Sequence, residues 1–340
     1  MSVSKRCSLC AVVVSGDAQR AAKWVRHSYP VLAAEGGVRI LLVPWGKNSE
    51  AVIREFPPVV QVKRAQLENH TLEDNLNLAL VSLLESPPDL VAFLDDDTYL
   101  RSNWARAMLQ SAEEDKDAGA FASVVFSATS GKLQSQGHAF VNAAPRDRGF
   151  NGKGLTCPLL GPCSNSAVVR WSAIAGIRDV HPQVWDPLFN QRQTCFDFGL
   201  KLALTGVRSL IVEAAEADHE GYLSTGTEWP YMRAAEEVRL QLSRRYLLYA
   251  KFLSGRAYKC AVRALEDRIP RWRRDGYPHF HQVVGDAVDE VHAAAVVEAR
   301  RLMSSLLTSA WRTLMERRSD QFDLLGLGDP GCCLPTATCK

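Results

Sequence analysis

Along the first 225 residues, the pattern of apolar and polar positions switches repeatedly between a strand-like and a helix-like spacing. Short β-branched or apolar runs, typical of buried strands, alternate with longer segments in which apolar residues recur at helical spacing. The pattern predicts strands at 10–15, 38–43, 59–63 and 90–94, and helices at 18–34, 49–56 and 72–84. This βαβαβαβ order predicts an α/β domain with a mostly parallel sheet and helices on both faces.

The alternation continues after residue 102, with one loop-rich interruption. The predicted elements are a helix at 102–114 with Ser102 as its N-cap, a strand at 120–128, a helix ended by Gly206 at the C′ position, and a strand at 209–212. Residues 130–157 contain several glycines and predict a loop-rich border to a site.

Three adjacent carboxylates, Asp95, Asp96 and Asp97, follow the apolar run 90–94 directly. Ligands of open α/β sheets bind outside the carboxyl ends of strands, which is where this run ends. Neighbouring carboxylates repel one another without a cation, and oxygen-rich clusters suit hard ions such as Mg2+ and Mn2+. The run therefore predicts a divalent-cation site, and the alternative is a solvated acidic turn.

The order of motifs over residues 8–225 resembles the family 2 glycosyltransferases of the GT-A fold. The acidic run matches the D-x-D motif of that family, and 161–176 match its small-residue segment before a strand and Arg. Residues 197–208 match its pattern D-x-x-L-R-L-x-x-x-G-x-R with Lys201 in place of the first Arg, and His219 matches the His after the next strand.

The resemblance implies a metal-dependent glycosyltransferase that moves a sugar from a nucleotide diphosphate to an acceptor hydroxyl with inversion. The implied donor is a UDP-sugar and the implied cofactor is Mn2+ or Mg2+. Asp97, Asp95 and His219 are the expected metal ligands, and Asp97 is the first choice. Asp95 and Asp96 are also expected to contact the donor.

A carboxylate at the start of a helix on the rim of the sheet is suitably placed to act as a general base. Asp197 is the first candidate and Asp186 is the reserve. The family shows a Glu-Asp pair just before this position, whereas this chain has Thr194-Cys195. The alternative role of Asp197 is a negative charge that complements the helix dipole.

The donor pocket expected after the second strand also departs from the family, which has an Asp in a V-D-N-G-S-type segment. Here the segment 43–49 offers Trp45, which can stack on a base or simply pack, and Lys47, which can meet a phosphate. Asn77 matches an Asn that the family carries in its third helix. These three residues are the remaining candidates for donor binding.

Beyond residue 229 the alternation stops, and helical patterns cover 234–268 and 281–318. The predicted organisation is a catalytic domain at 1–225, a helical region at 226–322 and a flexible cysteine-containing tail at 323–340. Residues 239–274 hold eleven Lys or Arg against two acids, a net charge of +9. This segment fits a nucleic acid, an anionic membrane surface or an acidic acceptor, or else helices that pack on the catalytic domain or pair subunits.

Composition narrows the class of protein. The chain has 340 residues, is 46% hydrophobic, and has no run near the roughly 18 apolar residues of a membrane span, so we expect a cytoplasmic protein, at most peripheral to a membrane. Its nine cysteines argue against a secreted disulfide framework. Cys7 and Cys10 have the spacing of half a zinc site but lead straight into a strand, and the thiols of the tail leave a redox or metal role open.

Two other functions fit parts of the sequence. A nucleotidyltransferase also places carboxylates on a parallel sheet, but the turn at 15–18 is a poor version of a phosphate-binding glycine loop. A non-catalytic nucleotide-sugar-binding module fits the missing Glu-Asp pair. The acceptor class, whether glycan, peptide or nucleic acid, is not specified by the sequence.

Overall fold

The chain folds around one large mixed sheet in the computed structural model, which describes residues 7–64, 71–141, 144–149, 155, 157–220, 235–253, 255–270, 287–306, 311 and 313–314. Its nine described strands run in the order β3-β2-β1-β4-β10-β6-β11-β5, and β7 pairs with β6. They are β1 (Leu9–Ser15), β2 (Arg39–Pro44), β3 (Gln61–Val62), β4 (Leu90–Asp95), β5 (Thr98–Leu100), β6 (Ala118–Ser127), β7 (Leu133–Ser135), β10 (Ser166–Arg170) and β11 (Arg208–His219). The predicted helix-covered sheet is confirmed.

Strand direction follows the βαβ connections at one side of the sheet. Strands β1, β2, β3 and β4 are parallel, β10 runs antiparallel to β4 and β6, and β11 is parallel to β6. A separate hairpin pairs β8 (His138–Val141) with β9 (Ala144–Asp147). The segment predicted to be loop-rich at 130–157 thus contains three short strands, too short for periodicity to reveal.

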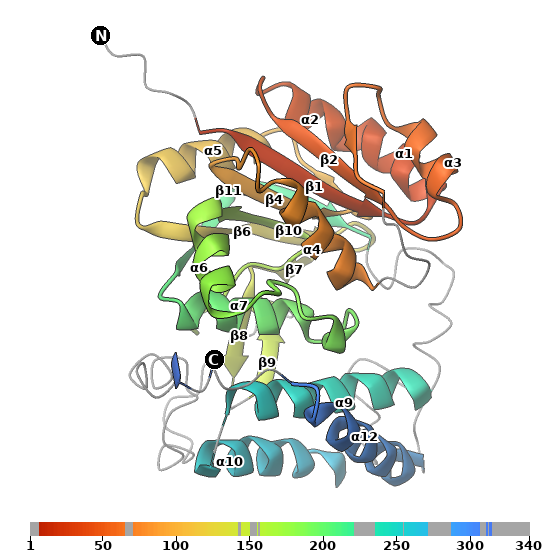
Figure 1. The fold of residues 1–340 in the computed structure, drawn as a ribbon, viewed down its shortest axis with the longest axis vertical. Coiled ribbons are helices and arrows are strands. Elements are labelled where there is room, and N and C mark those ends of the chain that lie inside the picture. Colours follow the sequence, from red (N-terminus) through yellow and green to blue (C-terminus); the bar gives the residue numbers. More distant parts are fainter. Residues whose placement is uncertain are drawn as a thin grey trace.

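Helices cover both faces of the sheet, as Figure 1 shows. One face packs against α1 (Ala18–His27), α2 (Tyr29–Ala33), α3 (Ser49–Glu55) and α5 (Trp104–Glu114). The other face packs against α4 (Leu72–Ser82), α6 (Trp171–Val180) and α7 (Thr194–Leu204). In β1, Cys10, Val12 and Val14 face the second layer, while Leu9, Ala11 and Val13 face the first. This twofold alternation is why β1 reads as a continuous apolar run.

Two predicted helix boundaries differ in the structure. The single helix expected at 18–34 divides into α1 and α2 at Ser28, with Pro30 in the first turn of α2. The Ser28 hydroxyl accepts a hydrogen bond from Leu100 N at 3.1 Å. The N-cap of α5 is Asn103 and not Ser102. The predicted role of Gly206 is confirmed, since it has φ +80° and Val207 N donates to Leu202 O at 2.9 Å.

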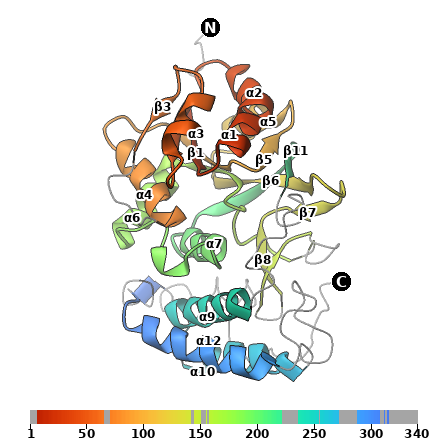
Figure 2. The same cartoon turned by 90° about the vertical axis from the view of Figure 1, so that its right-hand side faces the viewer.

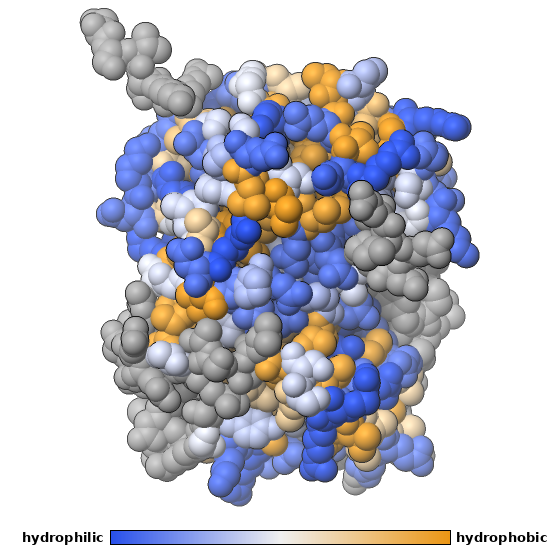
Figure 3. All heavy atoms as spheres, in the orientation of Figure 1, coloured by the Kyte–Doolittle hydropathy of each residue, from blue (hydrophilic) through white to orange (hydrophobic). Residues whose placement is uncertain are grey.

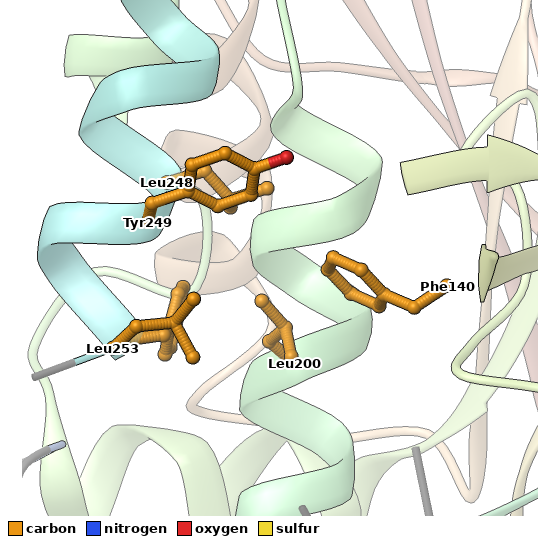
Figure 4. A pocket seen from close by; sticks show the side chains of 6 residues that line it. Phe140, Leu200, Leu248, Tyr249 and Leu253 are labelled. Carbon is orange, nitrogen blue, oxygen red and sulfur yellow. The ribbon is translucent and has the colours of Figure 1, made fainter. Parts of the chain in front are cut away.

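The C-terminal helices form a layer beneath the sheet domain, visible in Figures 1 and 2. The pattern at 234–268 forms α9 (Ala235–Phe252) and α10 (Gly255–Glu266), and the pattern at 281–318 includes α12 (Val288–Met303). Figure 4 shows Leu248 and Tyr249 of α9, and Leu253 just after it, facing Leu200 of α7 and Phe140 of β8. The expected tail at 323–340 lies outside the described residues, and the predicted domain boundaries stay a prediction.

The layer of C-terminal helices is joined to the sheet domain by a buried ion network. Lys251 of α9 has a fully buried side chain, and its Nζ lies 2.6 Å from Asp186 Oδ2 and 2.7 Å from Asp197 Oδ1. Lys201 Nζ lies 2.7 Å from the other oxygen of Asp197. Two cations and two anions thus balance inside the core, as buried charges require.

Three of the four basic side chains of α9, namely Arg239, Arg244 and Lys251, form ion pairs within the fold. Arg244 and Arg239 both form ion pairs with Glu298 of α12, and Arg192 of the sheet domain pairs with Glu237 of α9. These contacts favour packing of helices over an exposed basic face, so binding of nucleic acid or membrane through 239–274 stays a prediction. Residues 271–274 lie outside the described residues.

The described helices include none that is both long enough and apolar enough to span a membrane. On the face drawn in Figure 3, hydrophobic residues are interspersed with hydrophilic ones. Val81 and Leu84 at the end of α4 are among the exposed large apolar side chains.

We predict that Lys251→Met lowers the free energy of unfolding by roughly 3–5 kcal/mol, because it leaves two buried carboxylates with one ammonium group. Urea unfolding followed by circular dichroism measures this loss. Lys259→Met, at an exposed position of α10, is the matched control and changes the free energy by less than about 0.5 kcal/mol. A loss below about 1 kcal/mol for Lys251→Met would contradict the role of the network.

Candidate functional site

The three carboxylates lie at the end of β4, in the middle of the sheet. Strand alternation places Asp95 on the face of Val91 and Phe93, toward α7, and Asp96 on the opposite face, toward α1. Ser15, the last residue of β1, donates a hydrogen bond to Asp96 Oδ2 at 2.7 Å. The adjacent ends of two parallel strands therefore build the first part of the site.

A tight turn at 96–97 brings the third carboxylate to another strand. After the turn β5 pairs antiparallel with β11, and the register sets Thr98 opposite His219. This register places Asp97 beside that imidazole, with Nε2 of His219 3.3 Å from Asp97 Oδ1. The backbone closes the same turn, since Glu220 N donates to the carbonyl oxygen of Asp97 at 2.9 Å.

His219 is held on its other side by Gln134 of β7. The Gln134 amide nitrogen lies 2.9 Å and its oxygen 3.2 Å from Nδ1, so this amide can serve either tautomer of the ring. Burial opposes the charged imidazole, but the charge of Asp97 raises the pKa of His219. The same pairing, against the effect of burial, lowers the pKa of Asp97.

The remaining two carboxylates have less compensation. Burial raises the pKa of Asp96 to about 6 despite the Ser15 hydroxyl, and the nearest cation is Arg20 of α1 with 4.0 Å between NH1 and Oδ1. Burial and the charge of Asp97 raise the pKa of Asp95 to about 8. Asp95 makes no ion pair with a described residue, and the charge of His219 only partly offsets the effect of burial.

Asp95, Asp97 and His219 together form a cluster that fits a divalent cation. One ligand atom of each lies within 4.8 Å of the others. Two carboxylates and one imidazole suit Mn2+ and Mg2+, and three protein ligands leave coordination positions for phosphate oxygens. The burial of Asp95 beside Asp97, which raises the pKa of Asp95 to about 8, is the observation that a bound cation would explain.

The predicted donor-binding residues lie in different surroundings. Trp45 is partly buried beside Gly16, and Trp45 N donates to Ser15 O at 2.7 Å, so it borders the same end of β1. Lys47 is exposed in the following turn. Asn77 uses both ends of its amide on the backbone of Trp185, at 2.6 and 3.1 Å, which favours a structural role. Donor binding by the three residues stays a prediction.

The two candidate bases lie in the buried ion network and not at the acidic run. Asp197 is 1% exposed and contacts two lysine ammonium groups, and Asp186 also caps the 3-10 helix η2 (Pro187–Phe189) through Leu188 N. Lys251, against the effect of burial, lowers the pKa of Asp186. Such contacts favour a scaffolding role for both carboxylates, and their role as a base stays a prediction.

The loop before α7 is strained. Asn190, Gln191 and Gln193 have φ of 44°, 63° and 63°, a left-handed conformation that residues other than glycine rarely adopt. Buried Glu73 of α4 holds this loop, because its Oε1 accepts hydrogen bonds from Gln191 N at 2.6 Å and from the Thr194 hydroxyl at 2.5 Å. The start of α7 is therefore positioned by contacts from distant parts of the chain.

Sequence patterns did not reveal three residues that hold the site, namely Ser15, Gln134 and Glu73. Each acts across a long sequence separation and belongs to no motif of its own. The position of Ser15 at the end of the first strand was the one available signal, since the ends of parallel strands meet at one edge.

Comparison with solved structures identifies the architecture. The sequence matches no protein-family model and no curated protein. The structure is similar to that of GalNAc-T7 with UDP, GalNAc and Mn2+, with a TM-score of 0.51 and 12% identity over 95% of this chain and 59% of that one. It is also similar to S. aureus TarS 1–349 in complex with UDP-GlcNAc, with a TM-score of 0.50 and 14% identity over 92% of each chain. The chain has a GT-A fold.

The GT-A fold predicted from the motif order is therefore confirmed. The chain spans 59% of the length of the GalNAc-T7 chain that it matches. The acidic run of this GT-A domain lies at the carboxyl end of a central strand, where its strand topology predicts a site.

We predict that Asp95→Asn raises the free energy of unfolding of the metal-free protein by roughly 1 kcal/mol or more at neutral pH, because the folded protein keeps Asp95 protonated at a pH where the unfolded chain ionises it. The pKa of Asp95 is higher in the folded than in the unfolded state, so its ionisation costs stability as pH rises from about 4 to about 8. The advantage of the variant is therefore largest near pH 8 and disappears near pH 4.

Urea unfolding in the presence of a chelator measures this difference at each pH. Asp117→Asn, at an exposed position, is the control and leaves the free energy unchanged within about 0.5 kcal/mol. An advantage of Asp95→Asn that is absent at pH 8, or equal at all pH values, would show that Asp95 carries no such cost.

Proposed function

We propose that this chain is a metal-dependent glycosyltransferase that moves a sugar from a nucleotide-diphosphate donor to an acceptor hydroxyl. The single observation that carries the proposal is the cluster of Asp95, Asp97 and His219 at the end of β4 in a GT-A fold. GalNAc-T7 with UDP and Mn2+, and TarS with UDP-GlcNAc, share this fold and support a UDP-sugar as the donor.

The residues of the cluster have distinct roles in this proposal. A bound divalent cation, Mn2+ or Mg2+, would supply neutralisation of the charge on a departing diphosphate. Asp97, Asp95 and His219 hold it, and Gln134 fixes the imidazole by a hydrogen bond to Nδ1. Asp96 accepts a hydrogen bond from Ser15, and it thereby positions the end of β1, where Trp45 and the donor nucleotide are proposed to meet.

The proposal also covers the general base and the stereochemical outcome of the reaction. Inversion needs one base that takes the proton of the acceptor hydroxyl, and Asp197 was the candidate from sequence. Its burial between Lys201 and Lys251 supports a scaffold more than a base. Asp197→Asn separates the two, because loss of a base removes transfer without loss of stability, whereas loss of a scaffold lowers both.

Two alternative functions have different products. A nucleotidyltransferase would form a nucleotide sugar and release pyrophosphate, whereas the proposed enzyme releases a nucleoside diphosphate. A non-catalytic module would bind a nucleotide sugar without turnover. The departure from the family at Cys195 is the feature that favours the module.

We predict that, with Mn2+ present, a panel of nucleotide sugars contains a donor from which the protein releases a nucleoside diphosphate, with water as the acceptor. Asp97→Ala lowers that rate by about 100-fold or more, because it removes the first metal ligand and with it charge stabilisation of the leaving group. Chromatography of the released nucleotide measures the rate, and isothermal titration measures donor binding.

Asp117→Ala is the matched control, because it removes an exposed carboxylate outside the site and leaves the rate unchanged. Binding of a donor without any release would favour the module, and release of pyrophosphate would favour the nucleotidyltransferase. Equal rates for the wild type and Asp97→Ala would contradict the metal site.

A further inference from the structure

A second group of side chains able to bind a metal lies at the start of α7, where three segments of the chain approach one another closely. His138 begins β8, and it exchanges hydrogen bonds with the loop before β10, from His138 N to Gly161 O and from Leu160 N to His138 O, both at 2.8 Å. A Cβ atom on Gly161 would lie 2.7 Å from Cα of Gly199 in α7. Only a glycine permits this approach, so the backbone itself fixes the three segments together.

The close approach brings together His138, Cys163 and Cys195. One ligand atom of each, an imidazole nitrogen and two sulfurs, lies within 4.8 Å of the others. Zinc binds sulfur at about 2.3 Å and imidazole nitrogen at about 2.0–2.1 Å in a tetrahedron. A tetrahedron with these bond lengths separates its ligand atoms by about 3.5–3.8 Å. Small side-chain adjustments therefore suffice to bind one ion.

The imidazole of His138 is buried, and the groups beside it are the thiol of Cys195 and the carboxylate of Asp147. Its exposed fraction is 2%, and neither ring nitrogen makes a hydrogen bond of good geometry with a described residue. The carboxylate of Asp147 lies nearby, with Oδ1 3.1 Å from Nδ1, and the ring of Phe196 packs 4.3 Å away between centroids. A buried imidazole with a carboxylate on one side and thiols on the other has the surroundings typical of a metal-binding histidine.

We propose that His138, Cys163 and Cys195 bind one zinc ion. Zinc replaces the two thiol protons, so binding releases two protons and gives a site of two thiolates and one neutral imidazole. Asp147 then accepts a hydrogen bond from Nδ1–H while Nε2 binds the metal, a common arrangement around zinc-bound histidine. The fourth position is left for water or another oxygen or nitrogen ligand.

The two clusters differ in the metal that their ligand atoms prefer. Two sulfurs and an imidazole select zinc, whereas the carboxylates of Asp95 and Asp97 favour the harder Mn2+ or Mg2+. The zinc ion would link β8, the loop before β10 and the first turn of α7, all in the sheet domain. It would thereby fix the strained start of α7 without any step of sugar transfer passing through it.

The test begins with the unmodified full-length chain. Purified under reducing conditions and dialysed, it is expected to retain about one zinc per chain by mass spectrometry of the metal. Replacement by Co2+ is expected to give the near-ultraviolet absorption of thiolate-to-cobalt charge transfer. Zinc is also expected to protect Cys163 and Cys195 from alkylation, which peptide mass spectrometry measures without any variant.

Variants then assign the ligands. Cys195→Ser and Cys163→Ser are each expected to lose the zinc and most of the cobalt band, whereas Cys260→Ser in α10 keeps both. Asp97→Ala is expected to keep the band, and Cys195→Ser to keep Mn2+ binding, so failure of one site is distinguishable from failure of the other. Absence of zinc from the wild type, or a disulfide between Cys163 and Cys195 in the freshly isolated protein, would overturn the proposal.

Discussion

The crowding of three carboxylates at the end of one buried strand is the constraint on which the site depends. Their mutual repulsion must be balanced by the surroundings, and the structure balances two of the three. Ser15 and Arg20 face Asp96, and His219 faces Asp97. Burial and the charge of Asp97 raise the pKa of Asp95 to about 8, so its ionised form is disfavoured until a cation balances it.

The topology of the sheet produces this arrangement. β1 and β4 are parallel neighbours, so their carboxyl ends present Ser15 and the acidic run together. The short β5 turns back along β11, and its register delivers Asp97 to His219 although the two are more than a hundred positions apart. Below the sheet, Lys251 of α9 and Lys201 together neutralise Asp186 and Asp197, so the C-terminal helices complete the core under α7. The site thus rests on packing of the whole chain.

The sequence revealed the parts of this architecture that have a local signal. The strand at 90–94, the acidic run after it and the end of α7 at Gly206 follow from apolar periodicity and from the conformational freedom of glycine. The order of these motifs was sufficient to predict the GT-A fold. The division of the first helix at Ser28 was missed, although Pro30 is a local signal for a helix start; only the hydrogen bond from Leu100 N to the Ser28 hydroxyl depends on distant sequence.

Side-chain roles were harder to predict, since they depend on partners distant in sequence. Asp197 has the position of a catalytic carboxylate in the motif, yet two buried lysines surround it. Asn77 matched a family position, yet its side-chain amide is hydrogen-bonded to the backbone of Trp185. His138, Cys163 and Cys195 lie too far apart in the sequence to form a recognisable metal-binding motif. The close packing of glycines in three segments brings them together in the fold.

The central claim is that Asp95, Asp97 and His219 bind the cation that meets the donor diphosphate. Anomalous X-ray scattering from a crystal of the protein grown with Mn2+ and UDP tests it most directly, because manganese is located without assumption. The account predicts one strong manganese peak in contact with Asp97 and His219, and with an oxygen of the diphosphate. A manganese peak elsewhere, or none at saturating Mn2+ and UDP, would contradict it.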